Sequence, residues 1–176
     1  MRLMFITPAS RTPRASVWLI LFASVWMAVL GNLPLWQTLW HLPELKGWSG
    51  PWLIVGFALM IASALASLLA LLAWRWTLQP AITLLMLLCA FASHYMWQYG
   101  IVVDTPMLIN VLQTDAHEAR DQLSLSLLLN VLFLAVLPAG WVWQRPLQTV
   151  AWTRQALRNL GLFVTSLVLL LSLIHI

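Results

Sequence analysis

Long apolar runs alternate with short polar stretches along the whole chain. The runs occupy about residues 15–35, 51–73, 80–96, 123–142 and 160–176. Most of them approach the roughly 20 residues that an α-helix needs to cross the hydrocarbon core of a bilayer. Their apolar positions are continuous, whereas the strands of a membrane barrel alternate over about 10 residues. The pattern therefore predicts an all-α membrane protein with five transmembrane helices.

The composition supports this interpretation. Of the 176 residues, 62% are hydrophobic and only 8% are charged, and the mean hydropathy is +0.88. Ordinary globular chains are about 25% charged, so this chain has too little polar surface to cover a water-soluble body. The net charge of +4 comes from scattered residues and does not indicate binding to nucleic acid. Cys89 is the only cysteine, which excludes an internal disulfide and is typical of a small buried hydrophobe.

The basic residues predict the orientation. If the N-terminus is cytoplasmic, only Lys46 and Arg120 of the nine basic residues lie outside the cytoplasm. The other seven are Arg2, Arg11, Arg14, Arg75, Arg145, Arg154 and Arg158. Cytoplasmic loops carry the excess of Lys and Arg in membrane proteins. We therefore expect a multi-pass membrane protein with a cytoplasmic N-terminus, and with its C-terminus and the loop at 99–121 on the opposite side of the membrane.

The second run carries small residues at helical spacing. Ala58, Ala62 and Ala66 recur every four residues, and Ser63 and Ser67 lie beside them. Small residues let two membrane helices approach closely, so this stripe predicts helix packing and not a ligand site.

Residues 99–121, YGIVVDTPMLINVLQTDAHEARD, form the one long polar stretch. They contain four of the five acidic residues. Thr105 with Pro106, and Thr114 with Asp115, are typical of helix starts. We therefore expect short interfacial helices at headgroup level between the third and fourth spans.

Three polar residues of this stretch share a spacing of four. Asn110, Thr114 and Glu118 would lie on one helical face over about 12 Å. An amide, a hydroxyl and a carboxylate in a row suit a zwitterionic headgroup, with the donors on the phosphate and the carboxylate on an ammonium. The residues alone also allow a second interpretation, in which Thr114 and Asp115 only cap a helix and Glu118 belongs to a solvated face.

The run YGIVVDTPMLINVLQTDAHEARDQLS resembles the membrane domain of the lipid A phosphoethanolamine transferases, the family of the mobile colistin-resistance enzymes. The layout of five spans is also similar, and it implies the bacterial inner membrane, with the C-terminus and the 99–121 loop in the periplasm. The resemblance implies transfer of phosphoethanolamine from phosphatidylethanolamine to lipid A, or to a core sugar of lipopolysaccharide, and hence polymyxin resistance. It implies further that Asn110, Thr114 and Glu118 help to bind the headgroup of the donor lipid.

The resemblance also implies that catalysis needs a second domain. The family's threonine nucleophile and zinc ligands belong to an alkaline-phosphatase-like periplasmic domain, and residues 1–176 resemble no part of it. We therefore expect no metal or cofactor site in this chain and zinc in the missing domain. The last residues, 171–176, are typical of a reading frame cut short, so we expect a fragment that is inactive alone and serves as anchor and donor-lipid docking domain.

Two other functions remain as alternatives. A structural membrane-assembly protein needs only the small-residue stripe. A small transporter would need ionisable groups inside its spans, and no such group lies at the centre of a predicted span.

Overall fold

The computed structural model describes residues 16–100, 124–147 and 150–175, and every regular element in these ranges is a helix. The elements are α1 (Ser16–Val29), α2 (Leu33–His41), the 3-10 helix η1 (Pro43–Leu45), α3 (Ser49–Leu71), α4 (Leu78–Tyr99), α7 (Leu125–Val131), the π-helix η2 (Leu132–Val136), α8 (Leu137–Trp143) and α9 (Trp152–Ile174). The interfacial helices expected between the third and fourth spans fall in 101–123, outside the described residues.

The described helices suit a membrane. Four helical stretches, namely α3, α4, the continuous α7–η2–α8 and α9, are long and apolar enough to cross a bilayer. α1 and α2 form a fifth candidate if the pair, which bends by 46°, counts as one span. The prediction of an all-α membrane protein is confirmed.

The ends of two spans differ from those expected. The first pair of helices continues to His41 instead of ending near residue 35, and the last helix begins at Trp152 instead of near residue 160. Residues 152–158 precede the predicted fifth run, and their polar residues are typical of a linker. They form the first turns of α9, where the side chains of Gln155 and Asn159 both donate to the carbonyl oxygen of Ala73 in the turn after α3.

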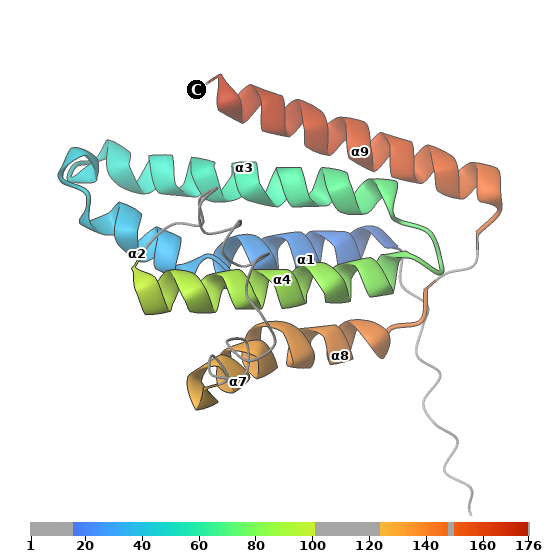
Figure 1. The fold of residues 1–176 in the computed structure, drawn as a ribbon. Coiled ribbons are helices and arrows are strands. Elements are labelled where there is room, and N and C mark those ends of the chain that lie inside the picture. Colours follow the sequence, from blue (N-terminus) through green and yellow to red (C-terminus); the bar gives the residue numbers. More distant parts are fainter. Residues whose placement is uncertain (1–15, 101–123, 148–149, 176) are drawn as a thin grey trace, which may run out of the picture.

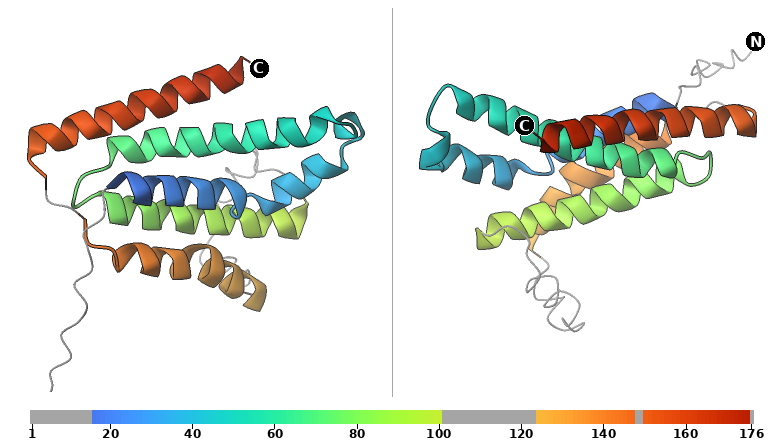
Figure 2. Two further views of the ribbon diagram at one scale, coloured as in Figure 1. Left: turned by 180° about the vertical axis from the view of Figure 1, so that it is seen from behind. Right: turned by 90° about the horizontal axis from the view of Figure 1, so that it is seen from above.

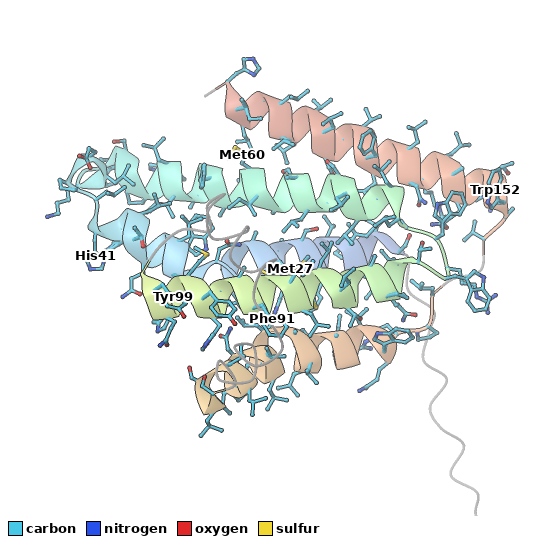
Figure 3. All side chains as sticks on the ribbon, viewed as in Figure 1. Met27, His41, Met60, Phe91, Tyr99 and Trp152 are labelled. Carbon is cyan, nitrogen blue, oxygen red and sulfur yellow. The ribbon has the colours of Figure 1, made fainter. Side chains whose placement is uncertain are left out.

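The helices stack in layers (Figure 1). α3 packs against both α1 and α9, whereas α4 packs against α1 and against the α7–α8 segment. The left view of Figure 2 shows the same order from behind. We call the two ends of the bundle the Tyr99 end, which also carries His41, and the Trp152 end (Figure 3).

The small-residue stripe lies where α3 meets its neighbours. Ser63, Ala66 and Ser67 are buried. The hydroxyl groups of the two serines donate to carbonyl oxygens of their own helix, at 2.7 Å for Ser63 and 2.9 Å for Ser67. Small side chains that satisfy their own polar atoms allow close helix packing in lipid.

A proline shapes the α7–α8 span. Pro138 has no N–H, so a carbonyl one turn earlier lacks its usual helical donor. The indole Nε1 of Trp26 in α1 donates to the carbonyl oxygen of Leu134 at 3.1 Å. The helix widens to π geometry over Leu132–Val136 at this place. A break in one span is thus compensated by a side chain from another.

Polar side chains also join α4 to α8. Gln79 Nε2 donates to the carbonyl oxygens of Val142 at 3.1 Å and Arg145 at 3.2 Å. Trp143 Nε1 donates to the hydroxyl group of Thr83 at 2.9 Å. These bonds hold the Trp152 end of the two spans together.

The bend between α1 and α2 depends on a glycine in tight contact with α4. A Cβ atom at Gly31 would overlap Cys89 Sγ and would lie only 2.7 Å from the carbonyl oxygen of Met27. Only a residue without a side chain lets the chain pass this close to α4.

The carbonyls that the bend exposes are satisfied locally. Asn32 Nδ2 donates to the carbonyl oxygen of Met27 at 2.9 Å. Trp36 Nε1 lies 3.1 Å from that of Ala28 and 2.9 Å from that of Val29. α2 can therefore turn towards α4 without leaving these groups unpaired.

We expect Gly31→Ala to lower the free energy of unfolding by about 1–3 kcal/mol, the usual cost of overpacking. The measurement is unfolding in mixed micelles titrated with a denaturing detergent. Gly161→Ala is the control, because a Cβ there meets no atom within 4 Å and alanine favours a helix. Equal stability of the Gly31→Ala variant and the wild type would contradict the tight contact.

Candidate functional site

The predicted site residues Asn110, Thr114 and Glu118 lie in 101–123, outside the described residues. The two flanks of that segment are described, and both lie at the Tyr99 end. Gly100 closes α4 in a left-handed conformation (φ 64°), and its N–H donates to the carbonyl oxygen of Met96 at 3.0 Å. Ser124 caps α7, and its Oγ accepts from the N–H of Leu127 at 3.1 Å.

A cavity of about 620 Å³ opens between α2, α4 and α7 at this end. Its wall is mostly apolar and includes Leu33, Pro34 and Phe133. The bend after α1 carries the first two of these residues towards α4. Ser93, His94, Ser126 and Asn130 supply the polar groups. The polar stretch 101–123 therefore joins two helices that both line one cavity.

His94 is held between the cavity and the aromatic residues of α4. Its side chain is only 7% exposed, and its ring meets the Tyr95 ring edge-on at 5.6 Å and 73°. Tyr95 in turn stacks on Tyr99 at 6.1 Å and 9°. The sequence predicts an interfacial histidine among aromatic side chains, but its burial in a cavity wall follows only from the packing of α7.

Asn130 is a site residue that the sequence analysis did not single out. Its Nδ2 donates to the carbonyl oxygen of Ala90 in α4 at 2.6 Å. This bond fixes the amide in the wall of the cavity and ties α7 to α4. The available signal was one amide inside an otherwise apolar run, since polar groups within membrane spans are costly and usually pair with another helix.

The arrangement suits an amphipathic molecule. Binding sites for small molecules are typically concave and apolar, with a few polar groups that orient the ligand. Within the described residues, no three side chains of His, Cys, Asp or Glu come together as a metal site. The described part of the cavity thus combines an apolar wall with a few polar groups that could orient a ligand.

A bundle of apolar helices that are long enough to cross a bilayer defines an integral membrane domain. Residues 60–176 match the family described as phosphoethanolamine transferase EptA/EptB. The chain therefore belongs to this family of membrane transferases, and the resemblance predicted from residues 99–124 is confirmed. The matched range includes the whole polar stretch.

Curated relatives agree with this assignment. The chain is 36% identical over 122 residues to phosphatidylethanolamine transferase Mcr-1 of Escherichia coli, which covers 66% of this chain and 23% of the relative. For Mcr-2 of the same species the identity is 32% over 118 residues, with 67% and 22% covered. Phosphoethanolamine transferase EptA of Escherichia coli K12 is 25% identical over 132 residues, with 73% and 24% covered. The chain thus spans less than a quarter of the length of these relatives.

One solved structure shares the fold. It is the integral membrane protein lipooligosaccharide phosphoethanolamine transferase A (EptA) from Neisseria meningitidis, with a TM-score of 0.79 and 22% sequence identity. The likeness covers 90% of this chain and 30% of that one.

We expect Asn130→Leu to destabilise the protein by about 0.6–2 kcal/mol, the range measured for hydrogen bonds between membrane helices. The variant keeps a similar volume but leaves the Ala90 carbonyl without this donor. Thr165→Val is the matched control, because the Thr165 hydroxyl group bonds only to Gly161 in its own helix. Detergent-titrated unfolding compares the two, and equal losses would contradict the role of Asn130 in joining α7 to α4.

Proposed function

We propose that this chain is the membrane anchor and donor-lipid docking domain of a phosphoethanolamine transferase. The donor is phosphatidylethanolamine, and the acceptor is lipid A or a core sugar of lipopolysaccharide at the periplasmic face of the inner membrane. The support is the family match, which spans the polar stretch, together with the names of Mcr-1 and Mcr-2 as phosphatidylethanolamine transferases. The reaction and its zinc would belong to a catalytic domain outside residues 1–176.

The cavity at the Tyr99 end is the observation that supports docking at this place. Its apolar wall suits the upper part of an acyl chain or the glycerol backbone of a lipid. The polar stretch begins and ends at helices that line the same cavity. The polar stretch is therefore joined at both of its ends to the wall of this cavity.

Within that stretch, Asn110, Thr114 and Glu118 are the proposed headgroup ligands. The amide and the hydroxyl group would donate to the phosphate, and the carboxylate would accept from the ammonium. A charged group partly removed from water needs an opposite charge close to it. Glu118 is the residue whose loss would leave the ammonium without its partner.

We expect Glu118→Gln to reduce retention of phosphatidylethanolamine about 10-fold, because a hydrogen bond to a charged group contributes roughly 1.5–3 kcal/mol. Native mass spectrometry of the purified chain with equal amounts of phosphatidylethanolamine and phosphatidylglycerol measures the effect. Glu44→Gln is the matched control, since Glu44 is an exposed acid at the same end of the bundle.

Unchanged retention in the Glu118→Gln variant would contradict the headgroup role. A wild-type chain with no preference for phosphatidylethanolamine would contradict docking altogether and would favour a structural membrane-assembly protein. Uptake or conductance of solutes by the reconstituted chain would instead favour a transporter.

The orientation forms a second part of the proposal. The described arginines gather at the Trp152 end, and Lys46 lies at the other end. The four described arginines at the Trp152 end are Arg75, Arg145, Arg154 and Arg158. The positive-inside rule then assigns the Trp152 end to the cytoplasm and the Tyr99 end to the periplasm.

A membrane-impermeant maleimide tests this orientation. In a Cys89→Ser background, we expect Gly47→Cys to react in intact spheroplasts and Thr153→Cys to react only after lysis. Both positions are exposed and lie at opposite ends of the bundle. The reverse labelling pattern would contradict the proposed topology.

A further inference from the structure

A second cavity of about 450 Å³ lies at the Trp152 end. It forms between the turn that joins α3 to α4 and the first two turns of α9. Arg75, Thr77 and Arg158 supply polar groups to its wall, and Trp74 and Trp152 supply aromatic ones. This cavity is separated from the Tyr99 end by the length of the spans, since the 23 residues of α3 rise about 34 Å.

The cavity carries positive charge that no described acid neutralises. Arg75 and Arg158 both line it and are both exposed. Among the described residues the only carboxylate side chain is that of Glu44, which lies in η1 just before the far end of α3. Within this part of the chain, the two guanidinium groups therefore face a cavity without an anionic partner.

Aromatic side chains hold the rim of the cavity. The rings of Trp74 and Trp152 stack at 5.3 Å with an interplanar angle of 26°, which joins the α3–α4 turn to the start of α9. The guanidinium carbon of Arg75 lies 5.2 Å from the centre of the Trp76 ring. Tryptophan and arginine at the end of a span are typical of the headgroup region of a bilayer.

Hydrogen bonds fix the first turns of α9 against the other helices. Gln155 Nε2 lies 2.9 Å from the carbonyl oxygen of Ala73 and 3.3 Å from Ser16 Oγ, and it donates to Asn159 Oδ1 at 2.9 Å. Asn159, which is buried, donates from Nδ2 to the same Ala73 oxygen at 3.0 Å. Arg158 lies between these two anchored residues, so its position beside the α3–α4 turn is set before any ligand binds.

We propose that this cavity binds the phosphate headgroup of an anionic phospholipid in the leaflet at the Trp152 end. Arginine side chains bind phosphate oxygens with paired, charge-assisted hydrogen bonds. Basic cavities between membrane helices are a recognised type of site for acidic lipid headgroups. A zwitterionic headgroup fits less well, because no described residue of the cavity wall offers a carboxylate to an ammonium.

This site differs in two respects from the proposed donor site. It lies in the opposite leaflet, and it selects for net negative charge instead of a zwitterion. Its role is to bind a structural lipid that joins the α3–α4 turn to α9.

The competing explanation is that the arginines only determine topology. Under the positive-inside rule, every arginine near the membrane contributes equally to the topology. In a binding site, only the arginines that line the cavity affect the affinity for the lipid. Arg154 makes the distinction testable, because it lies on the same helix one turn before Arg158, is exposed and does not line the cavity.

The test uses the purified 176-residue chain with equal amounts of phosphatidylglycerol and phosphatidylethanolamine, followed by native mass spectrometry of the bound lipids. We expect Arg158→Gln and Arg75→Gln each to reduce bound phosphatidylglycerol about 10-fold, since each removes charge-assisted hydrogen bonds to phosphate. Arg154→Gln should retain as much as the wild type. Thermal unfolding of each variant verifies that it is folded, and Arg158→Lys, which keeps the charge but not the paired donors, should lose less than Arg158→Gln.

Equal losses in the Arg154→Gln and Arg158→Gln variants would overturn the proposal, as would full retention in Arg158→Gln. Displacement of the bound phosphatidylglycerol by inorganic phosphate would show a site for free anions and would overturn the lipid assignment. The two proposals can be contradicted separately. Glu118→Gln should reduce only the retention of phosphatidylethanolamine, and Arg158→Gln should reduce only the retention of phosphatidylglycerol.

Discussion

The described fold depends on one constraint: a carbonyl oxygen that loses its helical donor in an apolar environment needs another hydrogen-bond donor. In lipid an unpaired backbone group costs several kcal/mol, so each break in a span needs a donor from elsewhere. Trp26 donates to Leu134 beside the break at Pro138, and Gln155 and Asn159 donate to Ala73 beyond the end of α3. The breaks are therefore also the places where separate helices become joined.

The two cavities with several polar groups in their walls both lie at such breaks. The cavity at the Tyr99 end forms where α2 turns away from α1, and the arginine-lined cavity forms where α3 gives way to α4 and α9 begins. Away from the breaks, helices pack directly on one another, as α3 packs on α1 and α9. Where a helix bends or ends, the neighbouring side chains no longer interdigitate, and space for a ligand remains beside polar groups.

The apolar runs and the polar stretch 99–121 predicted the all-α membrane class and the family, because hydrophobic length and a long local motif are both readable along the chain. The start of α9 at Trp152 was not predictable, since Gln155 and Arg158 look like linker residues until Ala73 is known to lie beside them. His94 and Asn130 are similar cases. Each is one polar residue in an apolar run, and only the packing of α7 on α4 makes them walls of one cavity. The roles of Asn110, Thr114 and Glu118 stay predictions from the motif.

The two ends of the bundle also differ in charge, and this difference bears on how one domain could handle two lipids. In the sequence, all five acidic residues lie in the connections of the Tyr99 end, whereas the described arginines lie at the Trp152 end. If both proposals hold, a zwitterionic lipid would find a carboxylate at the first end, and an anionic lipid would find the guanidinium groups of Arg75 and Arg158 at the second. Discrimination between lipids would then require no conformational change, because the wrong headgroup at either end would leave a charge without its partner. An anionic lipid bound between the α3–α4 turn and α9 would also stabilise the layer that carries α9.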